Sequence, residues 1–413
     1  MPQPSRLHLF QAYGVELEYM IVDRDSLQVK PITDELLKHM LGSYGSDFED
    51  GMVTWSNELV LHVVELKSTR PESNFSALEN QFAQNIRRIN AILTGWNAML
   101  MPTAAHPFMD PLAETKLWPH DNNDVYAVYN SIFDCRGHGW SNLQSTHLNL
   151  PFYDDEEFAK LHAAVRLVLP ILPALCASSP ILDGTFTGSL DTRLHYYKSN
   201  QAKIPSITGK VIPEGVFSRR TYFNTIYEKI KQDISPYDTE QILDPIWVNS
   251  RGAIPRFDRG SIEIRVMDIQ ECPSADLAIV TVVIETLKAL VDGRFIPHDV
   301  QIKWKPDLLA DILDKTAEKA QDAVIDDADY LQVFGLKASS VKASELWRHI
   351  VEQLIEGNAA LLKWKPEIDV ILTQGTLAQR ILTRMGTNPS KESIAVVYKK
   401  LCACLEQNKM FLN

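Results

Sequence analysis

The stretch "GVELEYMIVD" at residues 14–23 places two glutamates at alternate positions in an otherwise apolar run. A period of two is typical of a β-strand, so Glu16 and Glu18 share one face while the apolar side chains share the other. Two carboxylates this close repel each other, and they are stable only on a solvated face or around a cation. The stretch alone leaves both interpretations open.

The composition is that of a globular protein with a large core. The chain has 413 residues, of which 45% are hydrophobic and 23% charged. No run approaches the roughly 20 apolar residues of a membrane helix, and the first residues, "MPQPSRLHLFQ", lack the apolar segment of a signal peptide. We therefore expect a soluble, cytoplasmic protein without a membrane partner. The five cysteines are scattered without a CxxC pair, which argues against a disulfide framework and a zinc site.

The charge restricts the partners. A formal net charge of -12 argues against nucleic-acid binding through a basic surface. An acidic protein can still bind an anion such as ATP where local arginines and metal ions neutralise it. We expect small-molecule substrates and no nucleic acid, while a homo-oligomer stays open.

Hydrophobic periodicity gives the organisation along the chain. Alternation predicts further strands at 58–69, at 143–152 and twice within 245–270, and helical spacing predicts helices at 31–41, 75–100, 154–177 and 274–291. The segment 178–215 has no clear period and is expected to be a loop, either functional or disordered. We expect one catalytic domain over 1–413, with a sheet-bearing core at 1–297 and a mainly helical part at 298–413 packed on the same body.

The predicted strands share an unusual polar face. An antiparallel sheet with helices on one face explains the alternation, but a solvated face normally carries mixed Lys, Thr, Ser and Gln. Carboxylates joined by one imidazole are ligands suited to Mg²⁺ or Mn²⁺. The sequence therefore predicts divalent metal binding on this face, with candidate ligands Glu16, Glu18, Glu65, His147 and Glu263.

Two acidic residues do not fit the alternation. Glu58 is out of phase with Glu65, and Asp268 is out of phase with Glu263 by one residue. Asp268 can join the polar face only through a β-bulge or at the end of its strand.

Arginines gather beside Glu263. The segment "NSRGAIPRFDRGSIEIR" holds Arg251, Arg256, Arg259 and Arg265. They could form surface salt bridges, each worth about 0–1 kcal/mol. They could also clamp phosphates, since a planar guanidinium binds phosphate through two hydrogen bonds. No Walker or Rossmann glycine motif occurs in the sequence, so a nucleotide would lie in the concavity of the sheet.

Six motifs together resemble the glutamate-cysteine ligase type 2 family of carboxylate-amine ligases, which shares its catalytic fold with glutamine synthetase. They follow the family's order over most of the chain: "GVELEY", "ELVLHVVELKST", "STHLNLP", "GSLDTRLHYYKSNQAKIPSITG", "NSRGAIPRFDRGSIEIRVMD" and "QGTLAQRIL". The resemblance implies an α+β fold with a curved antiparallel sheet. Its concave face would hold the active site, and helices would cover its convex face.

The resemblance also implies roles for single residues. Glu16, Glu18, Glu65, His147 and Glu263 match metal-binding positions, and Glu58 matches an acidic position beside them. Arg251, Arg256 and Arg265 match positions around the ATP phosphates, and Arg265, Arg256 and Glu263 are the expected catalytic residues. Asn149 and Arg193 fall where the amino-acid substrate or a phosphate would be contacted. The segment "THLNLP" departs from the family's "HVHVG", which affects the expected substrate more than the chemistry.

The implied activity is ATP-dependent amide formation with Mg²⁺ or Mn²⁺. A substrate carboxylate would attack the γ-phosphate of ATP, and an amine would then displace phosphate from the acyl phosphate. Glutamate and cysteine are the expected substrates, giving γ-glutamylcysteine. A guanidino kinase-like phosphotransferase and a non-catalytic ATP-binding protein are the alternatives.

Overall fold

The segment Gly14–Asp23 forms the central strand of an eight-stranded antiparallel sheet. The computed structural model describes residues 6–121 and 123–413. Strand β1 (Gly14–Asp23) pairs with β4 (Val63–Ser68) on one side and with β6 (Ser145–Pro151) on the other. The order across the sheet is β2-β3-β4-β1-β6-β10-β9, and β5 also pairs with β1. The remaining strands are β2 (Asp47–Asp50), β3 (Val53–Asn57), β5 (Ala98–Met101), β9 (Ala253–Arg256) and β10 (Ser261–Asp268).

The apolar face of β1 packs against helices. Val15, Leu17 and Tyr19 are fully buried in the main core. Three helices supply the other side of this core: α2 (Phe75–Leu93), α6 (Asp155–Val168) and α12 (Pro273–Val291). Burial of each such large apolar side chain contributes about 1.5–3 kcal/mol, so this face holds the sheet in place.

Helix starts follow the capping chemistry of the sequence. The side chain of Asn74 accepts a hydrogen bond from the N–H of Ala77 and so caps α2. The side chain of Asp154 caps α6 in the same way, and three further acids in the first turn suit the positive end of the helix dipole. The predicted helix at 154–177 ends at Val168 and continues only as short turns, because Pro170 and Pro173 lack the N–H that a helix requires.

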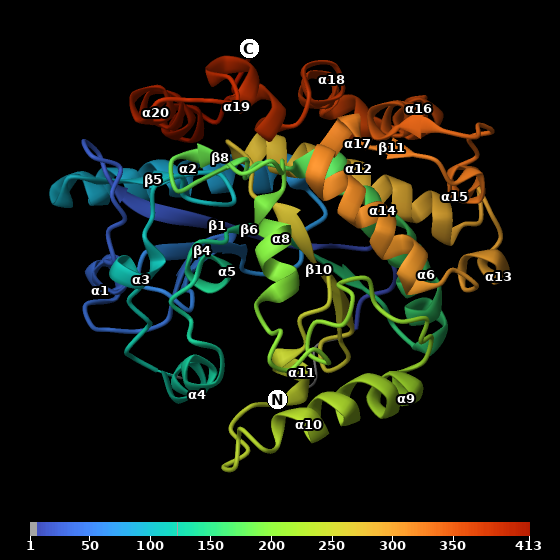
Figure 1. Ribbon diagram of the computed structural model, residues 1–413, viewed down its shortest axis with the longest axis horizontal. Helices are drawn as coiled ribbons and strands as arrows, with labels where there is room; N and C mark the ends of the chain where they lie inside the picture. Colours follow the sequence, from blue (N-terminus) through green and yellow to red (C-terminus); the bar gives the residue numbers. More distant parts are fainter. Residues whose placement is uncertain (1–5, 122) are drawn as a thin grey trace.

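Chain segments beyond the sheet surround it on several sides. In Figure 1 the C-terminal helices, orange to red, lie along one edge of the molecule, and α4, α10 and α11 lie at the opposite edge. Helices α16, α17 and α18 contact α12, and α20 contacts α2 and β5. The bounds of the other helices are α1 (Thr33–Leu41), α3 (Pro111–Glu114), α4 (Asn123–Phe133), α5 (His138–Ser141), α7 (Pro173–Cys176), α8 (Thr192–Ser199), α9 (Arg219–Tyr222), α10 (Glu228–Ile234), α11 (Pro245–Val248), α13 (His298–Gln301), α14 (Pro306–Lys319), α15 (Ala328–Val333), α16 (Ala343–Ile355), α17 (Ala359–Lys363), α18 (Lys365–Gln374), α19 (Leu377–Met385) and α20 (Lys391–Gln407).

Smaller elements complete the chain. Two short hairpin-like pairs lie outside the main sheet: β7 (Ile181–Leu182) with β8 (Thr185–Phe186), and β11 (Val324–Ile325) with β12 (Val341–Lys342). The segment 178–215, expected to be a loop, contains β7, β8 and α8. Within the described residues, none of the helices combines the length and the apolar character needed to cross a membrane.

The predicted strand at 58–69 is wrong in its first half. The structure has a separate strand β3 before Glu58 and begins β4 only at Val63. Between them the N–H of Leu61 bonds to the carbonyl of Lys116, and the carbonyl of Leu59 accepts the N–H of Trp118. These distant partners take the backbone out of the sheet ladder, so Glu58 lies in a loop.

A β-bulge precedes Asp268, which is one of the two ways in which this residue could join the polar face. Strand β10 pairs Ile264 with Leu148 and Met267 with Thr146, so it advances three residues where β6 advances two. The extra residue shifts the phase of everything after it. Asp268 therefore pairs with Ser145 and joins the face that carries Glu263 and His147.

Candidate active site

The polar face of the sheet lines a cavity of about 290 Å³. Acidic residues and arginines form one part of its wall, and aromatic side chains from α4, α5, α8 and α11 form another. Of the sequence-predicted site residues, the cavity is lined by Glu18, Glu58, His147, Arg193, Arg256 and Arg265.

Five acidic or imidazole side chains converge in two overlapping sets. In the first set, one ligand atom each of Glu16, Glu65 and His147 lies within 4.8 Å of the others. In the second set, the same holds for Glu18, Glu58 and Glu65. The strand register explains the convergence, because β1 pairs Glu18 with Glu65 and Glu16 with His147. Glu58 reaches the cluster from the loop after β3, which is why it was out of phase in the sequence.

Hydrogen bonds fix the orientation of these side chains. Nδ1 of His147 lies 2.9 Å from Oε2 of Glu16, and Nδ2 of Asn149 donates to Oε1 of the same carboxylate at 2.9 Å. Ser145 donates to Oε2 of Glu18 from its backbone N–H at 2.6 Å and from its hydroxyl at 3.0 Å. The carboxylates are therefore held in place by their neighbours on β6, and Asn149 acts here as a partner of Glu16.

Burial and mutual repulsion perturb the acids strongly. Burial raises the pKa of Glu58 to about 7, with a further contribution from the charge of Glu18. Burial, followed by the charges of Glu16 and Glu58, raises the pKa of Glu65 well above its usual range. Burial alone would also raise the pKa of Glu16, but the hydrogen bond with His147 lowers it to about 2. The cluster therefore keeps protons at neutral pH unless a cation compensates its charge.

The donor set fits a hard divalent cation. Each set offers carboxylate oxygens, and the first adds one imidazole nitrogen, a combination suited to Mg²⁺ or Mn²⁺. Nζ of Lys67 lies 3.5 Å from Oε2 of Glu65, yet burial and the neighbouring carboxylates still keep the pKa of Glu65 raised. A bound metal ion would displace the proton of Glu65 and bind its carboxylate. Glu16, Glu65 and His147 would hold one ion, and Glu18, Glu58 and Glu65 would hold another.

Glu263 lies between two arginines rather than with the other acids. Its carboxylate oxygens are 2.9 Å from Nε of Arg256 and 2.8 Å from Nε of Arg265. Burial would raise the pKa of Glu263, but the two guanidinium charges outweigh burial and lower it. Among the described residues it belongs to neither of the two acid sets. Its metal-binding role stays a prediction, and its evident contact is with Arg256 and Arg265.

Arg251 is held away from the cavity wall. Glu214 binds its guanidinium through two hydrogen bonds of 2.6 and 2.7 Å. Nη1 donates to the carbonyl of Ser206 at 3.2 Å. It is not among the described residues that line the cavity. A phosphate would have to displace Glu214 to reach this side chain, so the role predicted for Arg251 stays a prediction.

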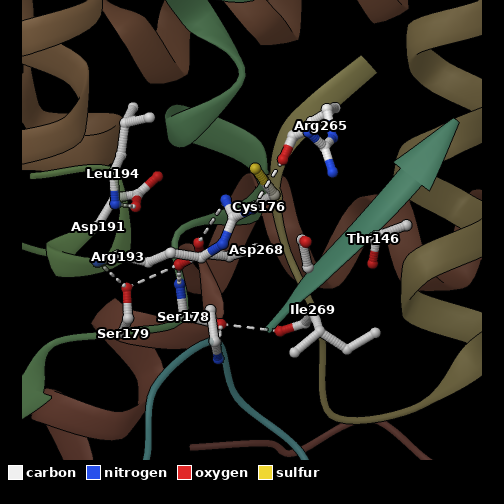
Figure 2. A network of polar contacts seen from close by, with 12 residues as sticks. Thr146, Cys176, Ser178, Ser179, Asp191, Arg193, Leu194, Arg265, Asp268 and Ile269 are labelled. Carbon is white, nitrogen blue, oxygen red and sulfur yellow. Dashed lines mark hydrogen bonds and ion pairs between the residues drawn. The ribbon is translucent and has the colours of Figure 1, made fainter. Parts of the chain in front are cut away.

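Arg193 is buried where α8 meets β10 (Figure 2). Nη2 donates to the main-chain carbonyl of Arg265 at 2.7 Å, and Nη1 lies 3.6 Å from Oδ1 of Asp268. Oδ2 of Asp268 accepts the N–H of Ser178 and the hydroxyl of Ser179, each at 2.8 Å. The predicted substrate contact thus lines the cavity and is also tied to the strand that carries Arg265.

A known protein family matches most of the chain. The model of the family described as "Glutamate-cysteine ligase family 2(GCS2)" matches residues 12–400. The chain belongs to glutamate-cysteine ligase family 2. The match includes all the site residues named in this section, and it confirms the resemblance inferred from the motifs.

Two relatives and one solved structure show how similar this family 2 chain is to other proteins. An uncharacterized protein of Archaeoglobus fulgidus is 31% identical over 97% of the chain and 100% of its own length. A protein of Cupriavidus metallidurans named "Putative glutamate--cysteine ligase 2" is 24% identical over 62% of the chain and 62% of its own length, so the match spans less than two thirds of that relative. A crystal structure of glutamate–cysteine ligase from Francisella tularensis in complex with AMP has a TM-score of 0.60 at 11% identity and covers 95% of the chain and 88% of that protein. This likeness confirms the fold class predicted from the sequence.

The aromatic wall of the family 2 site was missed in the sequence analysis. Trp247 lies between Tyr126 and Tyr129, with ring centroids 6.5 and 5.1 Å away, and Tyr129 also meets Trp140 at 5.3 Å. Tyr126 and Tyr129 are three residues apart on α4, a spacing that places them on one face of a helix. That spacing was visible in the sequence, but nothing local indicated that the face would turn toward the acids.

Proposed function

We propose that this protein is an ATP-dependent carboxylate-amine ligase that uses Mg²⁺ or Mn²⁺, with glutamate as the acid and cysteine as the amine. One observation carries the proposal: a cluster of carboxylates that needs a cation shares one cavity with Arg256 and Arg265. Metal ions and guanidinium groups are the usual means of binding a nucleotide triphosphate. Family membership supports the reaction class, and the names of the relatives support the two substrates.

The proposed reaction has two steps. An oxygen of the glutamate γ-carboxylate attacks the γ-phosphorus of ATP, the bond to the bridging oxygen breaks, and ADP leaves. The amine nitrogen of the second substrate then attacks the acyl carbon, the bond to the phosphate oxygen breaks, and phosphate leaves with the amide as product. The amine loses one proton in this second step.

The residues of the chain have separate tasks in this proposal. Arg265 and Arg256 would bind the transferred phosphoryl group and stabilise the charge that develops on it. Glu263 would orient both guanidinium groups, to which it is already bound. Asn149 and Ser145 would keep Glu16 and Glu18 in position. Bound divalent ions would neutralise the triphosphate, which is the chemistry they supply in such sites.

The aromatic wall has a role of its own in the proposal. Tyr126, Tyr129, Trp140 and Trp247 line the same cavity as Arg256 and Arg265. They would exclude water from an acyl phosphate, which water would otherwise hydrolyse.

The test is a product analysis with the purified protein. The protein is incubated with Mg-ATP, glutamate and cysteine, ADP release is followed, and the products are identified by mass spectrometry. We expect γ-glutamylcysteine together with stoichiometric ADP. If this pair fails, a panel of amino acids and amines tests the reaction class separately. The absence of any amide or acyl phosphate over the panel would refute the ligase, and a phosphorylated guanidine would instead identify a guanidino kinase-like enzyme.

A further inference from the structure

The β-bulge in β10 places Arg265 at an irregular point of the sheet. Opposite the bulge, the regular ladder between β10 and β6 is interrupted from Ile264 to Met267. Within this interval the backbone of Arg265 is held from the side of β9. Its N–H donates to the carbonyl of Gly252 at 3.0 Å, one step beyond the pair of Ile264 with Ala253. The N–H of Gly252 donates to the carbonyl of Val211 instead of to Arg265, and the carbonyl of Arg265 accepts Nη2 of Arg193 at 2.7 Å in its place.

Arg193 is fixed in turn from the opposite side. Arg193 is 2% exposed, and its backbone N–H donates to Oγ of Ser179 at 3.0 Å. Oγ of Ser179 donates to Asp268, which lies 3.6 Å from Nη1 of Arg193 (Figure 2). Asp268 is fully buried and stands on the same strand as Arg265, three residues later. The contacts therefore run from Arg265 through Arg193 to Asp268, so this circuit of contacts begins and ends on strand β10.

The charges of the residues in this circuit of contacts are compatible with their burial. Arg193 faces two buried carboxyl groups, Asp268 and Asp191. Burial, followed by the charge of Asp268, raises the pKa of Asp191 well above its usual range. Asp191 is thus neutral and caps α8 by accepting the N–H of Leu194. One guanidinium and one carboxylate remain, which is a balanced pair in a buried site.

We propose that Asp268 and Arg193 are positioning residues that hold the bulge and thereby aim Arg265 into the cavity. The proposal rests on the ligase function proposed above, because it assigns Arg265 a part in phosphoryl transfer. Arg193 acts on the main chain of Arg265, so its loss should misdirect the Arg265 side chain while leaving the acid cluster intact. A misplacement of about 1 Å in an active site can cost roughly 10²-fold in rate.

A double-variant cycle tests this connection. Asp268→Asn preserves the size of the side chain and an oxygen for the Ser178 N–H but removes the charge facing Arg193. We expect kcat to fall roughly 10- to 100-fold in Asp268→Asn, together with a weaker affinity for Mg-ATP, because a misdirected Arg265 binds the phosphates less well. In the Arg265→Ala background, the same change should have almost no further effect, because Arg265 is no longer there to be aimed. An equal loss in both backgrounds would overturn the proposal.

A matched control separates positioning from a general loss of packing. Asp238 is also buried and accepts the main-chain N–H groups of Ile242 and Leu243, and among the described residues its side-chain hydrogen bonds do not reach β10. Asp238→Asn should lower the melting temperature and leave kcat close to the wild-type value. If it lowers kcat as much as Asp268→Asn does, the positioning role is refuted.

Two further measurements cover the remaining outcomes. If Asp268→Asn does not fold, Ser179→Ala removes one contact to Asp268 and one to Arg193, and it should show a smaller loss with the same dependence on Arg265. If the wild-type protein forms no product with any substrate pair, the ligase proposal fails by itself. The cycle is then read from Mg-ATP affinity, which Asp268→Asn should weaken only when Arg265 is present.

Discussion

Arg265 carries the most direct prediction about a single side chain. Its Nε lies 2.8 Å from Glu263, and the residue lines the cavity beside the acid cluster. We expect Arg265→Ala to lower kcat for ADP release by roughly 10²-fold or more, by analogy with the loss of one preorganised donor to a developing charge. Arg265→Lys should restore little, because a lysine cannot reproduce the planar fork of a guanidinium.

Arg259 provides the control for this prediction. It belongs to the same arginine-rich segment, but its side chain is 75% exposed, and its ion pair among the described residues is with Asp258, at 3.8 Å. Arg259→Ala should retain wild-type turnover. Near-normal turnover in Arg265→Ala as well would mean that Arg265 has a structural role only.

His106 gives a prediction about pH. Its Nε2 bonds to the carbonyl of Leu27 at 2.6 Å and its Nδ1 accepts the N–H of Phe108 at 3.0 Å, so the ring is neutral. Burial lowers the pKa of His106 to about 4. Between the ordinary value of about 6.5 and this value, the unfolded state binds a proton that the folded state does not. Stability should therefore fall with falling pH, by about 1.4 kcal/mol per pH unit from this residue.

Thermal unfolding of His106→Gln measures this contribution. The variant should be less stable than the wild type near neutral pH, because it loses a buried ring and at least one hydrogen bond. Its melting temperature should nevertheless fall less between about pH 7 and about pH 5 than that of the wild type. Equal decreases in both proteins would show that His106 does not control this part of the pH dependence.

Strands and helices differ in how far the sequence could specify them. The alternation around Glu16 and Glu18 correctly predicted a strand and the face that lines the cavity, because side-chain direction in a strand follows from local geometry. The boundary near Glu58 could not be predicted, since it depends on hydrogen bonds with Lys116 and Trp118 from a distant segment. The bulge before Asp268 is an intermediate case, in which the phase required an irregularity but did not fix its partners.

Gly252 directly precedes strand β9 and accepts the N–H of Arg265, so a substitution there tests how the backbone beside the bulge affects activity. A methyl group at this position would lie 2.8 Å from Cγ1 of Val266 and 2.9 Å from Cγ1 of Val211, which is too close for real side chains. Gly252→Ala should therefore displace the backbone that accepts the Arg265 N–H, lowering both the melting temperature and kcat. Gly95→Ala is the matched control, because a methyl group there meets nothing within 4 Å. Unchanged kcat in Gly252→Ala would show that the bulge tolerates displacement.

Assembly of the whole site brings together residues that no local pattern connects. The fold class and the convergence of Glu16, Glu18, Glu65 and His147 were predictable, because both follow from strand alternation and residue type. Glu58 joins these residues from a loop, and Glu263, which was predicted with them, lies between two arginines instead. The partner of each arginine could not be predicted, because Arg251 meets Glu214 and Arg193 meets Asp268 only after the chain has folded. The aromatic wall was missed for the same reason, because α4, α5 and α11 approach the sheet from three separate segments.

The acid cluster leads to a prediction about the stability of the entire molecule. Glu65 and Glu58 hold protons in the absence of a cation, because burial and neighbouring charges raise the pKa of each. Binding of Mg²⁺ or Mn²⁺ with ATP should release protons and stabilise only the folded state, by about 2.7 kcal/mol at a ligand concentration of 100 times Kd. We expect the melting temperature to rise by several degrees with Mg-ATP relative to ATP with a chelator, and Glu65→Gln to lose most of this rise. Glu318→Gln, an exposed control whose partner is Lys319, should keep it in full.

Calorimetry in two buffers of different ionisation enthalpy measures the protons released. A melting temperature that does not respond to divalent ions, with or without ATP, would remove the metal site, because the buried carboxylates would then have to be stable through protonation alone.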